Sequence, residues 1–236
     1  MTATISVLGR GYVRLVDHMG DDLSIVRAAR VSYAADWRTG EEGNKDEKLL
    51  RYLLDNHHTS PFESVVFTFE VKCPIFIARQ WHRHRTWSYN EISARYTELP
   101  NEFYVPRPEH IGLQSTKNKQ QRELAINLSG SELQHAVDVA ASMRQHNENA
   151  FALYQEFLEE GVPRELARSV LPVATYTRFF GTVNLHNLLR FIDLRLHSHA
   201  QWEAQQYAKA LASLIKLVVP VTHKILDLDS RSESLA

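Results

Sequence analysis

Residues 83–96 read Arg83-His84-Arg85-Thr86-Trp87-Ser88-Tyr89-Asn90-Glu91-Ile92-Ser93-Ala94-Arg95-Tyr96, and the rest of the chain is organised around this stretch. No apolar period runs through it, which indicates a loop rather than a core segment. An arginine guanidinium is planar, always charged and able to donate two parallel hydrogen bonds, so it suits a phosphate or a planar heterocycle. Asn90 and Glu91 add donors and acceptors for the edge of a base. The stretch therefore predicts a loop that binds an anionic nucleotide.

The bulk composition is that of a globular protein without a general attraction for polyanions. The chain has 236 residues, 44% of them hydrophobic, which is enough for a buried core in one large domain or two small ones. Its formal net charge is −1, which argues against nucleic acid or an anionic membrane as a partner. A site for an anion must then come from local clustering of arginines.

Cysteine usage and hydropathy predict a cytoplasmic protein. Cys73 is the only cysteine, so no disulfide can form within the chain. The first residues show no charged segment followed by an apolar one, and no run of about eighteen apolar residues occurs. We therefore expect neither a signal peptide nor a membrane span.

Short strands and longer helices alternate along the sequence. Apolar alternation and β-branched runs predict strands at 5–8, 12–16, 65–71, 103–105 and 173–183. Helical spacing and capping residues predict helices that begin at Asp22, Asn44, Pro74, Ser131, Pro163, Asn184 and Ala200. Asp22 is the predicted cap of its helix, and the pairs Asn44–Glu47 and Ser131–Gln134 are predicted capping boxes.

Three predictions concern the faces and ends of these helices. The helix opened by Pro74 is predicted to place Gln80, Arg83, His84 and Trp87 on one face. Arg164 and Arg168 are predicted to lie on one helix, and Pro220 is predicted to end the last long helix.

Two segments are predicted to be poorly ordered. Residues 107–123 are polar and without a period, which predicts a mobile segment, and residues 229–236 are predicted to be a frayed tail. The whole is interpreted as one α+β domain over residues 1–236, with a mixed sheet of short strands and long flanking helices. It has no Gly-x-Gly-x-x-Gly, so a Rossmann domain is not supported.

Motifs along the chain resemble those of flavin-dependent thymidylate synthases. Arg83-His84-Arg85, seven further residues and then Ser93 match the signature of that family. The resemblance continues at residues 28–33, 58–63, 76–81, 90–96, 164–168 and 184–199. These segments cover nearly the whole chain in order, which makes the resemblance far more specific than one short motif.

The resemblance implies the fold of that family and its reaction. dUMP would be methylated to dTMP with 5,10-methylenetetrahydrofolate as carbon donor and NADPH-reduced FAD as hydride source, and tetrahydrofolate would be released. It also implies a homotetramer with shared active sites. The sequence agrees with a route that uses no thiol, because Cys73 ends an apolar strand and is expected to be a small buried hydrophobe.

The resemblance also assigns site residues. Arg195 matches the arginine that polarises the pyrimidine at N3 and O2, and a fixed cation favours negative charge on a ring that must become a carbon nucleophile. dUMP would contact Gln80, Trp81, His82, Arg83, Glu91, Ile92, Ser93, Ala94, Arg95, Arg168 and Arg195. FAD would contact Ser60, Arg83, His84, Arg85, Glu91, Asn184, Leu185, His186 and Arg190.

Spacing adds detail to these assignments. Arg95 and Arg168 are the strongest phosphate candidates, as bidentate donors. Asn184 and Arg195 are predicted to share one face of a helix, and His186 and Arg190 a second. Relatives often carry Arg at position 186 and Asn at position 190, so this chain departs from the family pattern there.

The residues leave other functions open. A non-catalytic nucleotide- or RNA-binding module could use the same arginines, although the net charge argues against nucleic acid. A flavoenzyme with a different acceptor is a third possibility. Ser93 lacks a Gly-x-Ser-x-Gly context, so a nucleophilic role is disfavoured. No metal site is expected, because the histidines are not spaced as in any zinc pattern. These histidines are His57, His58, His82, His84, His197 and His199.

Overall fold

The computed structural model describes residues 3–40, 43–123 and 130–233. The chain divides into two compact units that interleave along the sequence. The first unit comprises Met1–Val71, His82–Asn90 and Phe179–Ala236, and the second unit comprises Lys72–Trp81 and Glu91–Arg178. The single domain expected over residues 1–236 stays a prediction.

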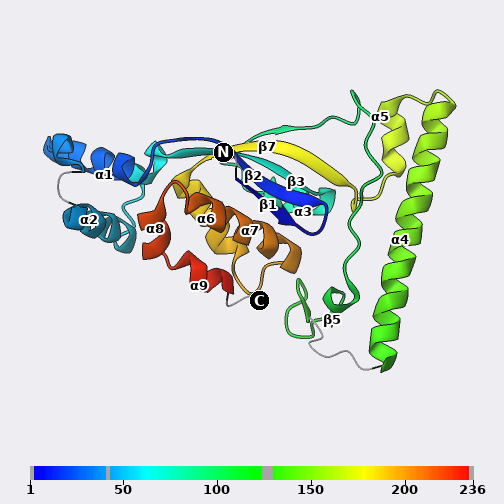
Figure 1. The fold of residues 1–236 in the computed structure, drawn as a ribbon. Helices are drawn as coiled ribbons and strands as arrows, with labels where there is room; N and C mark the ends of the chain where they lie inside the picture. Colours follow the sequence, from blue (N-terminus) through cyan, green and yellow to red (C-terminus); the bar gives the residue numbers. More distant parts are fainter. Residues whose placement is uncertain (1–2, 41–42, 124–129, 234–236) are drawn as a thin grey trace. The chain divides into compact units, whose positions relative to one another are not determined.

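A five-stranded sheet confirms the α+β class (Figure 1). Its order is β1-β2-β3-β7-β4, with β1 at Thr4–Val7, β2 at Gly11–Met19, β3 at Val66–Pro74, β7 at Tyr176–Asn184 and β4 at Ser88–Glu91. The strand predicted at 65–71 is confirmed, because alternate side chains are fully buried at Val65, Phe67, Phe69 and Val71. β1 pairs with β2 in antiparallel register, with Val7 opposite Gly11.

The helices of the first unit build its core against the strands. They are α1 (Asp22–Arg30), α2 (Gly43–Asp55), α6 (Leu185–Arg195), α7 (Trp202–Ile215), α8 (Pro220–Ile225) and α9 (Leu228–Glu233). α7 packs against α6 and also contacts β1 and β2 (Figure 1). Its apolar stripe is buried at Tyr207, Leu211 and Ile215. None of the helices described is long and apolar enough to cross a membrane.

The structure corrects the predicted ends of three of these helices. The N-cap of α1 is Asp21, whose side chain accepts from the backbone N–H of Ser24, whereas Asp22 caps α8. Asn44 lies within the first turn of α2 rather than at its cap. α7 ends at Ile215, so Pro220 does not end it as predicted; Pro220 instead begins α8, since proline suits the first helical position.

The predicted frayed tail is in part a helix. Residues 229–233 belong to α9, which is held by ion pairs from Asp229 to Lys216 at 2.7 Å and from Arg231 to Asp193 at 2.6 Å. Residues 234–236 lie outside the described part of the chain.

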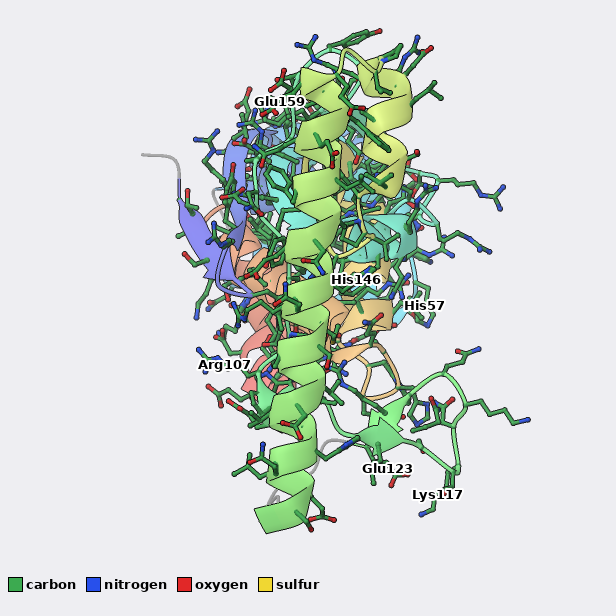
Figure 2. All side chains as sticks on the ribbon, turned by 90° about the vertical axis from the view of Figure 1, so that its right-hand side faces the viewer. His57, Arg107, Lys117, Glu123, His146 and Glu159 are labelled. Carbon is green, nitrogen blue, oxygen red and sulfur yellow. The ribbon has the colours of Figure 1, made fainter. Side chains whose placement is uncertain are left out.

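The second unit contains α3 (Ile75–Trp81), the long α4 (Gly130–Glu159) and α5 (Arg164–Ala167). Figure 2 shows α4 along its length, with His146 and Glu159 labelled. The last turns of α4 bury Phe151 and Tyr154 in a small apolar cluster with Ala167 of α5. This cluster anchors the C-terminal end of the long helix.

Four predictions for the second unit need correction. Residues 103–105 form only a single bridge, between Phe103 and Thr175. The polar segment 107–123 contains a hairpin of β5 (Leu113–Gln114) and β6 (Arg122–Glu123), and its mobility stays a prediction. Ser131 lies inside α4 rather than at its cap. α5 ends at Ala167, so Arg168 opens a short 3₁₀ turn and does not share a helix with Arg164.

Candidate functional site

The stretch at 83–96 is not a loop throughout. α3 ends at Trp81, so the helical face predicted for Gln80, Arg83, His84 and Trp87 is wrong. A turn follows, and Ser88–Glu91 then forms β4. The boundary between the two units falls after Asn90, so the predicted site residues are divided between the units.

An aromatic cluster holds the turn in the first unit. Trp87 is buried, with its ring centroid 6.1 Å from that of Tyr89 and 5.4 Å from that of Phe191 on α6. The Tyr89 hydroxyl donates to the backbone carbonyl of His84 at 2.9 Å, and burial raises the pKa of Tyr89. A side chain at Gly181 would place its Cβ 2.9 Å from Cε3 of Trp87, so only glycine fits against this ring. The cluster therefore fixes the backbone that carries His84.

Arg195, the predicted catalytic residue, meets His84 within the first unit. Its Nε–H donates to Nε2 of His84 at 3.3 Å, and the His84 ring lies 4.6 Å from the ring of Phe191. Burial, followed by the nearby cations Arg195 and Arg190, lowers the pKa of His84 to about 4. The ring is therefore neutral at physiological pH and acts as an acceptor. Burial also lowers the pKa of Arg195 itself.

Helix α6 and its N-cap carry four of the nine predicted flavin residues. Asn184 is its N-cap, and Oδ1 of Asn184 accepts from the backbone and side-chain amides of Asn187 at 3.0 and 2.9 Å. Leu185 is fully buried, and its N–H donates to the carbonyl of Val65 at 2.8 Å. Leu185 therefore presents no exposed group to a ligand in this structure.

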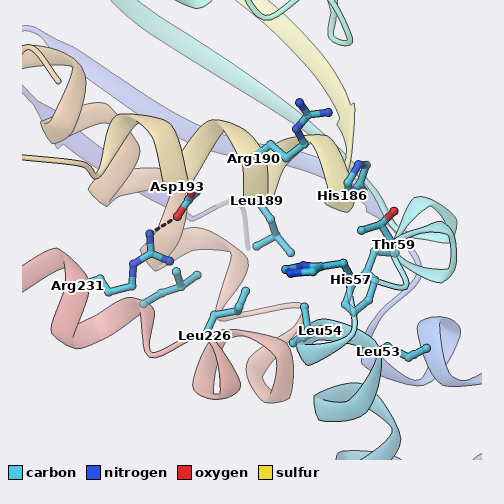
Figure 3. A pocket seen from close by; sticks show the side chains of 12 residues that line it. Leu53, Leu54, His57, Thr59, His186, Leu189, Arg190, Asp193, Leu226 and Arg231 are labelled. Carbon is cyan, nitrogen blue, oxygen red and sulfur yellow. Dashed lines mark hydrogen bonds and ion pairs between the residues drawn. The ribbon is translucent and has the colours of Figure 1, made fainter. Parts of the chain in front are cut away.

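A pocket of about 350 Å³ opens on the second face of α6, within the first unit (Figure 3). His186 and Arg190 both line it, which confirms that they share a face. The other lining residues are Leu53, Leu54, His57, Thr59, Phe62, Leu189, Asp193, Leu226, Leu228 and Arg231. Figure 3 shows the side chain of His57 directed toward Leu189. The lining is thus mostly apolar, and α6 adds the imidazole of His186, the cation of Arg190 and the carboxylate of Asp193, which pairs with Arg231.

The remaining predicted residues of the first unit lie outside this lining. Ser60 begins the 3₁₀ helix Ser60–Ser64, directly after Thr59. Arg83 and Arg85 are exposed on the turn before β4. The ring of His82 packs 4.6 Å from that of Tyr89.

In the second unit, the two arginines predicted to bind phosphate approach one glutamate. Arg95 pairs with the carboxylate of Glu165 at 3.6 Å, and Nε of Arg168 donates to the backbone carbonyl of Glu165 at 3.4 Å. All three side chains are exposed. The structure therefore brings these two predicted phosphate ligands together.

The segment after β4 is held by backbone bonds in the same unit. The N–H of Ile92 donates to the carbonyl of Arg178, and the N–H groups of Tyr96 and Thr97 both donate to the carbonyl of Ser93. Ala94 is buried. Trp81, the last residue of α3, is also buried, and Gln80 precedes Trp81 on that helix. The N–H of Ile92 is therefore already engaged within the protein.

Two supporting residues escaped the sequence analysis. Thr177 donates from Oγ1 to Oε1 of Glu91 at 2.5 Å, which fixes a predicted ligand of both dUMP and FAD. The buried amide of Gln205 donates to the carbonyls of His197 and Ala200 at 3.2 and 3.0 Å, which ties down the loop after Arg195. Neither pairing has a signal in the sequence, because its partners lie on different elements.

Cys73 is an inert thiol in this fold. It is fully buried on β3, and burial, followed by the charge of Glu91, raises its pKa well above the usual value. Because the thiolate is the nucleophilic form, this group is not suited to attack a substrate. The expectation of a small buried hydrophobe is confirmed.

Comparisons with known proteins agree in sequence and in structure. The family model described as "Thymidylate synthase complementing protein" matches residues 14–221. The chain is 49% identical over 217 residues to the flavin-dependent thymidylate synthase of Thermosipho africanus, covering 92% of this chain and 90% of that one. It is 50% identical over 218 residues to the protein of the same name from Thermus thermophilus, covering 92% and 76%.

A solved structure shows the same fold. The UMP/dUMP methylase PolB from Streptomyces cacaoi, bound with 5-Br dUMP, superposes with a TM-score of 0.81 at 38% identity. The match covers 94% of this chain and 97% of that one.

Proposed function

The chain belongs to the thymidylate synthase complementing protein family, and from that premise we propose that it catalyses the flavin-dependent methylation of dUMP to dTMP. The observation that carries the proposal is the similarity, over more than nine tenths of the chain, to proteins named flavin-dependent thymidylate synthase. A solved relative titled a UMP/dUMP methylase, at 38% identity, supports dUMP as the substrate.

The proposed reaction uses two co-substrates. C5 of dUMP loses a proton and gains a carbon from 5,10-methylenetetrahydrofolate, and two electrons from NADPH reduce that carbon to a methyl group. The products are dTMP, tetrahydrofolate and NADP⁺, with one further proton consumed. FAD, when bound, supplies the hydride to the transferred carbon.

The residues of the first unit fit a flavin. Apolar side chains line most of the pocket beside α6, and His186 and Arg190 add polar groups able to meet an anionic cofactor. In our proposal the cofactor is held by Ser60, Arg83, His84, Arg85, Glu91, Asn184, Leu185, His186 and Arg190.

The proposed role of Arg195 is to stabilise negative charge on the pyrimidine. It is half-buried, and a cation in a partly desolvated site acts more strongly on a developing charge than one in water. Arg95 and Arg168 would take the phosphate, in place of the contacts they now make to Glu165. The other dUMP contacts are proposed for Gln80, Trp81, His82, Arg83, Glu91, Ile92, Ser93 and Ala94.

Purification and one assay test the proposal. We expect a yellow protein with flavin absorbance that releases tritium from C5 of labelled dUMP only when methylenetetrahydrofolate and NADPH are both supplied. A colourless protein that takes up no FAD and shifts oligonucleotides would contradict it and favour the nucleic-acid-binding alternative. A flavoprotein that releases no tritium would indicate a different acceptor.

The assembly forms part of the same proposal. We propose a homotetramer with shared active sites in the cytoplasm, as the family resemblance implies. Light scattering on the active enzyme should give about four times the chain mass of 27.2 kDa. An active monomer would refute the shared site.

A further inference from the structure

We propose that His84 is a positioning residue for Arg195: its ring nitrogen Nε2 holds the guanidinium by accepting from Nε–H. The inference rests on the proposed function, because it explains how the arginine proposed to act on the pyrimidine is kept in place. The proposed function also counts His84 among the residues that hold the flavin, and the two roles make different predictions.

The bond to His84 restricts the orientation of the Arg195 guanidinium. Arg195 is the last residue of α6, and its long side chain has many rotamers to lose when it is held in one position. A hydrogen bond at Nε fixes the plane of the guanidinium and uses one of its five N–H donors. The terminal nitrogens are then presented in a defined plane, which is the geometry for a bidentate grip on neighbouring ring atoms.

His84 is itself held at two points, its backbone and its ring. Its backbone carbonyl accepts from the hydroxyl of Tyr89 at 2.9 Å, and its ring packs on Phe191 at 4.6 Å. Phe191 and Arg195 are four residues apart on α6 and so share a face. One helix therefore supplies both the donor that His84 accepts from and the ring that His84 packs on.

The protonation state of His84 suits this role. Arginine can only donate, so Nε2 must carry no proton and the neutral ring must carry its proton on Nδ1. Burial and two cations of α6, Arg195 and Arg190, disfavour a second proton. With Nε2 engaged, Nδ1–H is the only ring donor left for a cofactor.

Two substitutions at His84 separate positioning from cofactor binding. His84→Leu keeps much of the volume but has no acceptor, whereas the amide oxygen of His84→Gln can take the place of Nε2. At saturating FAD, we expect His84→Leu to lower kcat for dTMP formation by about 10- to 100-fold, with KM for dUMP little changed. His84→Gln should recover most of that loss. Loss of FAD in both variants, with full turnover restored by added FAD, would overturn the proposal.

A double-mutant cycle tests whether His84 acts through Arg195. Arg195→Lys keeps the charge but removes the Nε–H donor. In that background His84→Leu should cost little more, so the two effects should be strongly non-additive. If His84→Leu costs the same factor with and without the Arg195 change, the proposal is wrong.

A third readout does not depend on turnover. The Nε–H proton of Arg195 should exchange slowly with solvent in the wild type, and fast in His84→Leu, when followed by ¹⁵N NMR. Equal exchange rates would refute the bond even in a protein that made no dTMP. Absence of dTMP formation by the wild type, with slow exchange intact, would instead refute the proposed function alone.

Discussion

Replacing Asp22 by alanine should destabilise the protein by roughly 3 kcal/mol, about three times the effect of the same change at Asp21. The carboxylate of Asp22 is 7% exposed and accepts three hydrogen bonds at the start of α8. They come from the N–H of Val221 at 2.8 Å, the N–H of Thr222 at 3.0 Å and the hydroxyl of Thr222 at 2.6 Å.

The magnitude follows from the burial of this cap. A hydrogen bond to a charged group contributes about 1.5–3 kcal/mol, and a buried donor left without a partner costs about 1–3 kcal/mol. These terms overlap and partial relaxation reduces them, which leaves roughly 3 kcal/mol. The neighbouring Asp21 caps α1 at an exposed position, where loss of a cap costs about 1 kcal/mol.

Thermal unfolding of the two variants checks the difference. For a chain of this size, Asp22→Ala should lower Tm by about 6–12 °C and Asp21→Ala by about 2–4 °C. Both must be measured at one protein concentration and flavin content, because assembly and ligand binding shift Tm. Equal losses, or a larger loss for Asp21→Ala, would show that α1 and α8 are not joined through Asp22.

Four further changes test the site. Gly181→Ala should cost about 1–3 kcal/mol, because its Cβ would lie 2.9 Å from the ring of Trp87, and an unchanged melting curve would contradict that packing. The pKa of His84 is about 4, below its unfolded value, so the unfolded state alone binds this proton as the pH falls toward 4 and stability is lost across that window. Denaturant unfolding of His84→Gln should show a weaker loss between pH 7 and pH 5, and an identical loss would refute the shift. Arg195→Leu should raise the pKa of His84, read by NMR, because one of the cations that disfavour its protonation is gone. Cys73→Ala should keep its turnover, and abolished dTMP formation at full flavin occupancy would reinstate a thiol mechanism.

The elements that were predicted correctly are those in which one buried face makes apolar residues recur at regular intervals in the sequence. The strand at 65–71 alternates because one face of it is fully buried. β4 has no such signal, since it ends the strand order of the sheet and its residues are largely exposed. α9 contains little apolar surface and is held by ion pairs to Asp193 and Lys216, which no local pattern reports.

Choices between adjacent residues also depended on distant elements. Asp21 and Asp22 are equally good caps by residue type, and only the position of α8 decides which one caps α1. A contact spanning two hundred positions cannot be inferred from spacing within one helix.

In the candidate site too, contacts within one helix were predicted and contacts between distant elements were not. The shared face of His186 and Arg190 followed from helical geometry and was confirmed by the pocket. The bond between His84 and Arg195 joins a turn to the end of a distant helix, so no local pattern indicates it. The helix predicted to reach Trp87 failed for a related reason, because that ring packs against Phe191 of α6.

The interleaving of the two units constrains how this protein can be recombined. The second unit is built from Lys72–Trp81 and Glu91–Arg178, so a continuous gene segment that encodes all of it must run from codon 72 to codon 178. That segment necessarily includes His82–Asn90, which belongs to the first unit and carries His84. A chimera that takes this segment from a relative would therefore also take that relative's turn before β4. The residue at position 84 would then come from one parent protein and Arg195 from the other.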